Sequence, residues 1–157
     1  MLALIKKALE SKKSAKRQPV ADAYTANVQL ATAALFIEMA TIDGTFSQTE
    51  KSTIVDILSQ HYSLSPAEVD SLLQQAKTQA DKSTDLWHFT SNINKNYSRA
   101  ERKNIVELLW RIVYSDGRLN KYEDYLIHKL ANLLRLDHKE LIDAKMKVLS
   151  EQKQSSS

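Results

Sequence analysis

Two aspartates and two glutamates recur at one spacing in the two halves of this sequence. Asp43 and Asp116 are each followed directly by glycine, and Glu50 and Glu123 come seven positions after them. Carboxylate oxygens are the ligands that hard divalent cations such as Ca²⁺ and Mg²⁺ prefer. The four residues are therefore a candidate metal site, formed within each half or by all four carboxylates together.

Two other roles would also explain an aspartate before glycine. Asp-Gly is a common turn pair, and its carboxylate can accept a hydrogen bond from a nearby backbone N–H in an Asx turn. Alternatively, the carboxylates could receive a basic residue of a protein partner. The spacing is not that of an EF-hand, because glycine occupies the sixth position of that loop and the second position here.

The elements that must position these carboxylates are helices. The chain has only two glycines and two prolines in 157 residues, too few for a fold with many tight β turns. Helix starts are marked by capping boxes, in which a Ser, Thr, Asn or Asp side chain and a glutamate three residues later satisfy the first free amides of a helix. The boxes are Ser47–Glu50, Ser65–Glu68, Ser98–Glu101, Asn120–Glu123 and Asp137–Glu140.

Apolar residues recur at helical spacing after each of these starts. The predicted helices are 22–42, 48–61, 66–80, 85–96, 99–115, 121–134 and 138–149. A basic amphipathic helix is predicted over 1–15, with a break near Pro19. The sequence thus predicts an all-α fold, a compact bundle of about seven helices over 21–150, between an N-terminal arm (1–20) and a polar tail (151–157) that we expect to be frayed.

The bundle is predicted to contain an internal two-fold pseudo-repeat. An offset of 73 superimposes the two Asp-Gly pairs and places Phe46 opposite Leu119. An offset of 72 then places Ser65 opposite Asp137. Each unit reads as an apolar helix, Asp-Gly, an apolar residue, a capped helix and a second capped helix. The glycine suits a left-handed helix end, and the apolar residue suits the position before the next cap.

These paired motifs, IDGTFSQTE at 42–50 and SDGRLNKYE at 115–123, resemble the TerB-like family, named for tellurite-resistance protein B. The resemblance covers about residues 24–146. It implies a bundle of about seven helices without established catalysis, a link to stress responses including tellurite, and metal binding through acidic residues. The residues of this chain that match the acidic residues of the family motif are Asp43, Glu50, Asp116 and Glu123.

The sequence departs from the family pattern at three places. Ile42 and Ser115 stand where many members have alanine, and Asn120 replaces the more usual Ser or Thr cap. None of these departures removes a carboxylate, so the expected fold and candidate site are unchanged.

The N-terminal arm offers a different function. Residues 1–20 hold six basic residues against Glu10, a net charge of +5, so of the total of +3 the rest of the chain carries −2. A basic amphipathic helix can lie on an anionic membrane surface. We therefore keep as an alternative a membrane-surface adaptor that acts through residues 1–17, with the Asp-Gly motifs purely structural. The other reading of the arm is that it docks on the acidic body or is disordered.

Composition restricts the remaining function classes. The absence of cysteine excludes a disulfide scaffold and a thiolate zinc site. The mildly acidic body argues against a nucleic-acid partner. No HExxH, glycine-rich phosphate loop or Gly-x-Ser-x-Gly elbow occurs, so we expect no enzyme, no cofactor beyond a divalent cation, and an unidentified protein partner. No apolar run approaches the length of a membrane span, which favours a cytoplasmic protein. If the basic arm binds lipid, the protein would lie peripherally on the inner membrane face.

Overall fold

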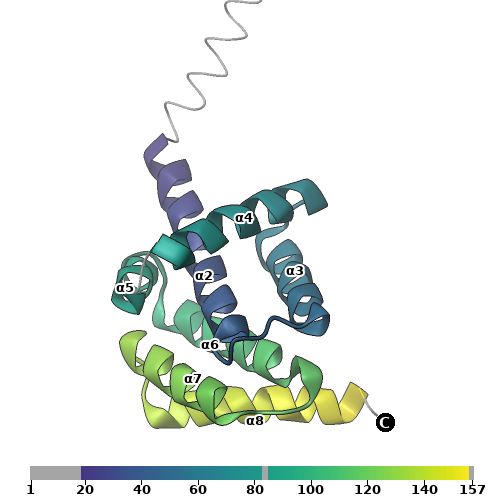
Figure 1. Ribbon diagram of the computed structural model, residues 1–157. Helices are drawn as coiled ribbons and strands as arrows, with labels where there is room; N and C mark the ends of the chain where they lie inside the picture. Colours follow the sequence, from purple (N-terminus) through teal and green to yellow (C-terminus); the bar gives the residue numbers. More distant parts are fainter. Residues whose placement is uncertain (1–18, 83–84, 156–157) are drawn as a thin grey trace, which may run out of the picture.

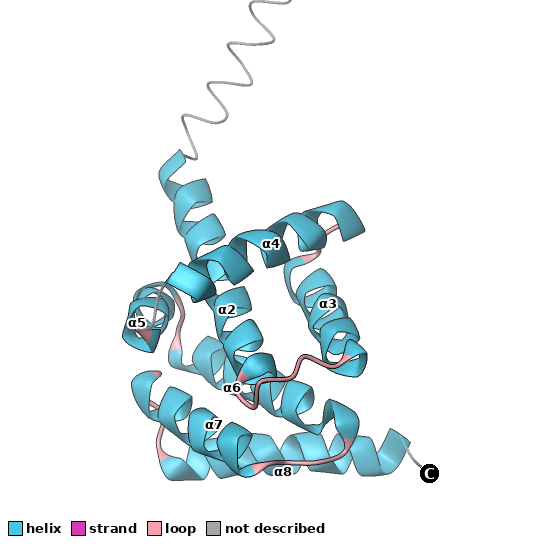
Figure 2. Ribbon diagram, in the orientation of Figure 1, coloured by secondary structure: helices cyan, strands magenta, loops and turns pink. Residues whose placement is uncertain are grey.

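The computed structural model describes residues 19–82 and 85–155, which contain helices and no strand (Figure 2). This confirms the predicted all-α bundle. The predicted helix over 1–15 lies outside the described residues. The elements are α2 (Pro19–Thr41), α3 (Gln48–Tyr62), α4 (Pro66–Lys82), α5 (Leu86–Asn96), α6 (Arg99–Val113), the 3₁₀ turn η1 (Tyr114–Asp116), α7 (Lys121–Leu133) and α8 (His138–Ser155).

Helix α2 is the centre of the bundle. No residue from Val28 to Ala40 is exposed, and the large side chains of Phe36 and Met39 are fully buried. A helix that is shielded from solvent around its whole circumference must be surrounded by other elements. Accordingly α2 packs against α3, α4, α5, α6 and α7, and Figure 1 shows it passing behind α4 into the middle of the molecule.

Helix α6 is the second central element. Its residues from Ile105 to Trp110 are all buried, and it contacts α2, α3, α7 and α8. The indole Nε1 of Trp110 donates a hydrogen bond to the backbone oxygen of Leu141 at 3.0 Å, which ties α6 to α8. Complete burial of one large apolar side chain typically stabilises a fold by about 1.5–3 kcal/mol, so α2 and α6 together carry much of the core.

The predicted repeat is present in the order and packing of the helices. Helices α3 and α7 begin 73 residues apart, and α4 and α8 begin 72 residues apart. Within the two units, α2 packs extensively on α4 and α6 packs extensively on α8. Between the units, α2 contacts α7 while α6 contacts α3, so each central helix touches the second helix of the other unit. Helix α5 connects the two units.

Most predicted helix ends lie within two residues of the observed ones, and the end of α8 differs by six. Helix α6 ends at Val113 rather than 115, because the chain tightens into η1 before Gly117. Helix α8 does not end near 149 but continues to Ser155, where Glu151 pairs with Arg111 at 2.8 Å and Gln152 donates to the backbone oxygen of Tyr114. Within the described residues, no helix is long and apolar enough to cross a membrane.

Candidate functional site

Both aspartates of the repeated motif form the predicted Asx turns. Oδ1 of Asp43 accepts hydrogen bonds from the backbone N–H of Thr45 at 3.0 Å and from its hydroxyl at 2.8 Å. Oδ1 of Asp116 accepts one from the backbone N–H of Arg118 at 3.1 Å. The turn-forming role is therefore real in both copies, and it occupies one oxygen of each aspartate.

The glycines between helices adopt the left-handed conformation, with φ of 85° at Gly44 and 82° at Gly117. No atom lies within 4 Å of the position that a Cβ would take at either one. The backbone angle, and not a lack of space, is therefore what requires glycine in these turns.

Both glutamates of the motif close capping boxes. The backbone N–H of Glu50 donates to Oγ of Ser47 at 3.0 Å, and Oε1 of Glu50 accepts from the backbone N–H of Ser47 at 3.3 Å. Asn120 and Glu123 make the same reciprocal pair at 2.8 and 3.2 Å. The other three predicted boxes are also present. Both glutamates are buried, with 5% of Glu50 and 4% of Glu123 exposed.

A hydrogen bond between the two units brings the motifs together. Nδ2 of Asn120 donates to Oδ2 of Asp43 at 3.0 Å, although the residues are 77 positions apart. The tertiary structure therefore gathers the four predicted carboxylates into one region, at the junction of the α2–α3 turn, η1 and the start of α7.

The pKa values show that these carboxylates act on one another. Burial raises the pKa of Glu123 to about 7, and the negative charges of Asp116, Glu50 and Asp43 add to the increase. Burial likewise raises the pKa of Glu50, with further increases from Asp43 and Asp116. By contrast, the hydrogen bonds from Thr45 lower the pKa of Asp43. The region thus holds an ionised Asp43 beside a glutamate, Glu123, that is partly protonated at neutral pH.

Three carboxylate oxygens remain available to a ligand. The second oxygen of Glu50, of Asp116 and of Glu123 accepts no hydrogen bond from the described residues. None of the three is an unsatisfied buried atom, so each reaches solvent. None of the four carboxylates takes part in an ion pair with a described basic side chain.

The donor chemistry fits a hard cation, but the side-chain positions do not form a coordination shell. Among residues 19–82 and 85–155, no group of three or more His, Asp or Glu side chains is arranged to hold a metal ion. A cation bound without side-chain rotation would therefore keep several of its waters, as Mg²⁺ commonly does. The predicted assignment of Asp43, Glu50, Asp116 and Glu123 as metal ligands stays a prediction.

Exposed apolar side chains belong to the same motifs. Phe46, which precedes the cap of α3, is 41% exposed, and Tyr122 and Tyr125 on α7 are 52% and 67% exposed. The sequence places both tyrosines beside Glu123, but only the structure shows that they point into solvent. Large aromatic rings are enriched at protein-binding surfaces relative to the rest of a protein's surface.

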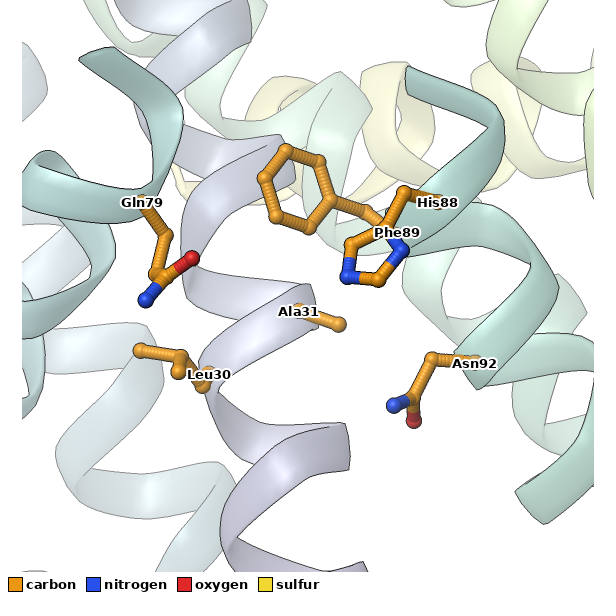
Figure 3. Close-up of a pocket in the computed structure, with 6 residues that line it drawn as sticks. All are labelled: Leu30, Ala31, Gln79, His88, Phe89 and Asn92. Carbon is orange, nitrogen blue, oxygen red and sulfur yellow. The ribbon is translucent and has the colours of Figure 1, made fainter. Parts of the chain in front are cut away.

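A cavity of about 210 Å³ lies elsewhere, between α2, α4 and α5, and contains none of the predicted site residues. Figure 3 shows Gln79 of α4 on one side of α2 and His88 and Asn92 of α5 on the other. Apolar atoms of Leu30, Ala31 and Phe89 complete the lining. The cavity is smaller than the roughly 300–1,000 Å³ of most ligand pockets, and no carboxylate or amine lines it.

Comparison with known proteins supports the observed architecture. The family model described as tellurite resistance protein TerB matches residues 29–146, which is most of the chain. No curated protein and no solved structure matches the sequence. The matched range begins in α2, ends in α8 and includes both Asp-Gly motifs with their capped helices.

Proposed function

This chain belongs to the TerB family, and from that premise we propose that it is a non-catalytic module that binds a divalent cation, Ca²⁺ or Mg²⁺, on its carboxylate face. We define the carboxylate face as Asp43, Glu50, Asp116 and Glu123. A role in a stress response, including resistance to tellurite, belongs to the same proposal.

The observation that carries the proposal is the mutual electrostatic effect of the four carboxylates. Burial raises the pKa of Glu123 to about 7, and the charges of the other three carboxylates add to the increase. No described basic side chain forms an ion pair with any of the four. A cation would remove this repulsion and displace the proton of Glu123. The free oxygens of Glu50, Asp116 and Glu123 would supply ligands, with water completing the shell.

Binding without catalysis is supported by the way the glutamates are held. One oxygen of each glutamate accepts the backbone N–H of the N-cap residue, which fixes the carboxylate in place. A general acid or base would instead need its carboxylate free to exchange a proton with a substrate. The described cavity between α2, α4 and α5 lacks a nucleophile paired with a base.

The test is a calorimetric titration of Ca²⁺ and of Mg²⁺ into the full chain and into the double variant Asp43→Asn/Asp116→Asn. Asparagine can also form an Asx turn, so the fold is retained while two charges are lost. The matched control is Asp56→Asn/Asp143→Asn, which neutralises two exposed aspartates outside the face. We expect saturable heat in the wild type and the control but not in the Asp43/Asp116 variant; equal heat in all three proteins would refute the proposal.

A protein partner is the second candidate ligand of the same face. The exposed rings of Phe46, Tyr122 and Tyr125 favour it, because such rings beside acidic groups suit a segment that contains both basic and apolar residues. In that case Tyr125→Ser should weaken capture of a partner as much as Asp43→Asn/Asp116→Asn does. Capture that survives both changes would place the partner surface elsewhere.

The membrane-surface alternative rests on the sequence of residues 1–17, which lie outside the described residues. Their excess of lysine and arginine favours contact with anionic lipid. Co-sedimentation with vesicles containing phosphatidylserine tests it. The full chain should sediment with the vesicles and a chain that starts at Val20 should not; equal sedimentation would remove this alternative.

A further inference from the structure

We propose that His128 and His138 form a second metal site, on the protein surface, for a transition-metal ion of the zinc, nickel or copper class. His128 lies on α7 and His138 is the first residue of α8. Their ring centroids are 5.9 Å apart, and the ring planes are inclined by 31°.

This separation suits two imidazoles that share one ion. Metal–nitrogen bonds to histidine are about 2.0–2.1 Å long, so two rings on the same ion have centroids roughly 4.5 Å apart at a right angle at the metal and roughly 6.4 Å apart when they lie opposite each other. The observed distance lies within that range. Imidazole nitrogen is a good ligand for zinc, nickel and copper but a poor one for Ca²⁺ and Mg²⁺, so this pair and the carboxylate face would select different ions.

The ring of His128 is already held with its ligating nitrogen free. Its Nδ1 lies 2.8 Å from the backbone oxygen of Asp124, and a carbonyl oxygen can only accept, so Nδ1 carries the hydrogen. In the neutral ring the lone pair is then on Nε2. The carboxylate of Asp124 lies 3.5 Å from the same Nδ1, and a carboxylate or carbonyl behind a histidine is the usual support of a metal ligand.

Backbone hydrogen bonds hold the connection between the two helices, and such preorganisation reduces the entropy lost on binding. Arg135 adopts a left-handed φ of 61°, and the backbone N–H of Leu136 donates to the oxygen of Ala131 at 3.0 Å. Both histidines are accessible, since the side chain of His128 is 41% exposed and His138 lies on the surface. Because the described residues hold no group of three such ligands, water or a second molecule would fill the remaining positions.

The experiment is a titration of Ni²⁺ into the tag-free full chain by calorimetry, at mildly alkaline pH because ligation requires neutral imidazole. The variants are His128→Gln and His138→Gln, and the matched controls are His61→Gln and His88→Gln, which remove the other two histidines. We expect saturable binding in the wild type and both controls, and affinity weaker by about tenfold or more in each variant of the pair.

A second measurement locates the ion without relying on affinity. Substoichiometric Cu²⁺ should broaden the imidazole signals of His128 and His138 in the nuclear magnetic resonance spectrum before those of His61 and His88. The Asp43→Asn/Asp116→Asn variant should keep its Ni²⁺ binding, which separates this site from the carboxylate face. Absence of saturable binding, or equal effects of all four histidine substitutions, would overturn the proposal.

Discussion

The side-chain amide of Asn120 joins the two units of the repeat, because its Nδ2 donates to Oδ2 of Asp43 while its Oδ1 caps helix α7. Serine has one side-chain oxygen and could not do both in this geometry. The corresponding pair, Ser47 and Asp116, shares no hydrogen bond. The repeat is therefore symmetric in its helices and asymmetric at its site, with the asymmetry located at Asn120.

Replacing Asn120 by serine should keep the helix cap and lose the contact with Asp43. We expect the free energy of unfolding to fall by about 0.5–1.5 kcal/mol, the usual net contribution of one hydrogen bond. Urea denaturation of Asn120→Ser, Asp43→Ala and the double variant measures the coupling between the two residues. Strictly additive effects would show that the bond contributes nothing to stability.

Glu123 should make the protein less stable as the pH rises toward neutrality. Its pKa is about 7 in the folded chain and about 4.3 when unfolded, so between these values the folded state binds more protons. Stability contributed by the protonated form is thus present below pH of about 4.3 and is lost as the pH rises through about 7. Glu123→Gln should remove a decline on the order of 1–2 kcal/mol, a range that allows for solvent near the carboxylate.

The measurement is the urea midpoint at several pH values across that window for the wild type and Glu123→Gln. Glu140→Gln is the matched control, since Glu140 also closes a capping box but Arg99 lowers its pKa to about 2. Its contribution is present above the unfolded pKa and is lost as the pH falls, so Glu140→Gln should lower stability by a nearly constant amount across the window and leave the decline toward neutral pH in place. Parallel curves for wild type and Glu123→Gln would contradict the prediction.

Cation binding on the carboxylate face should release protons. Because a bound cation stabilises the ionised form of Glu123, the proton that this glutamate partly holds at neutral pH must leave. The apparent heat of Ca²⁺ binding at pH about 7 should therefore differ between buffers of low and high ionisation enthalpy, and affinity should rise from pH about 6 to about 8. In Glu123→Gln the buffer dependence should disappear; a buffer dependence that persists there would assign the proton to another group.

Gly44→Ala should destabilise the turn through its backbone alone. The residue has a φ of 85°, and nothing lies near the position of an added Cβ. We expect a loss of about 1–2 kcal/mol, the cost of a left-handed conformation for an ordinary residue. Asparagine tolerates this conformation better, so Gly44→Asn should cost less than Gly44→Ala in thermal unfolding. Equal costs would mean that the angle is not the constraint.

The sequence by itself determined the features that depend on neighbours a few residues apart. All five predicted capping boxes are present, and they depend on hydrogen bonds that span three positions. Both aspartates also form the Asx turn, which was one of the roles that the sequence allowed them and which spans two positions. The repeat was visible for the same reason, since both units use the same local signals. The end of α8 was missed because its last turn is held by Arg111, 40 positions away.

The tertiary structure decided which of these local features come together in one site. From the sequence, a site could be formed by the two carboxylates of each half or by all four together. The packing of α2 against α7 and of α3 against η1 brings all four close enough for their charges to interact. The Asn120–Asp43 bond and the ring pair of His128 and His138 likewise join residues from different elements. A one-dimensional pattern specifies which residues can cap, turn or ligate, whereas burial and long-range packing specify which of them meet and at what pKa.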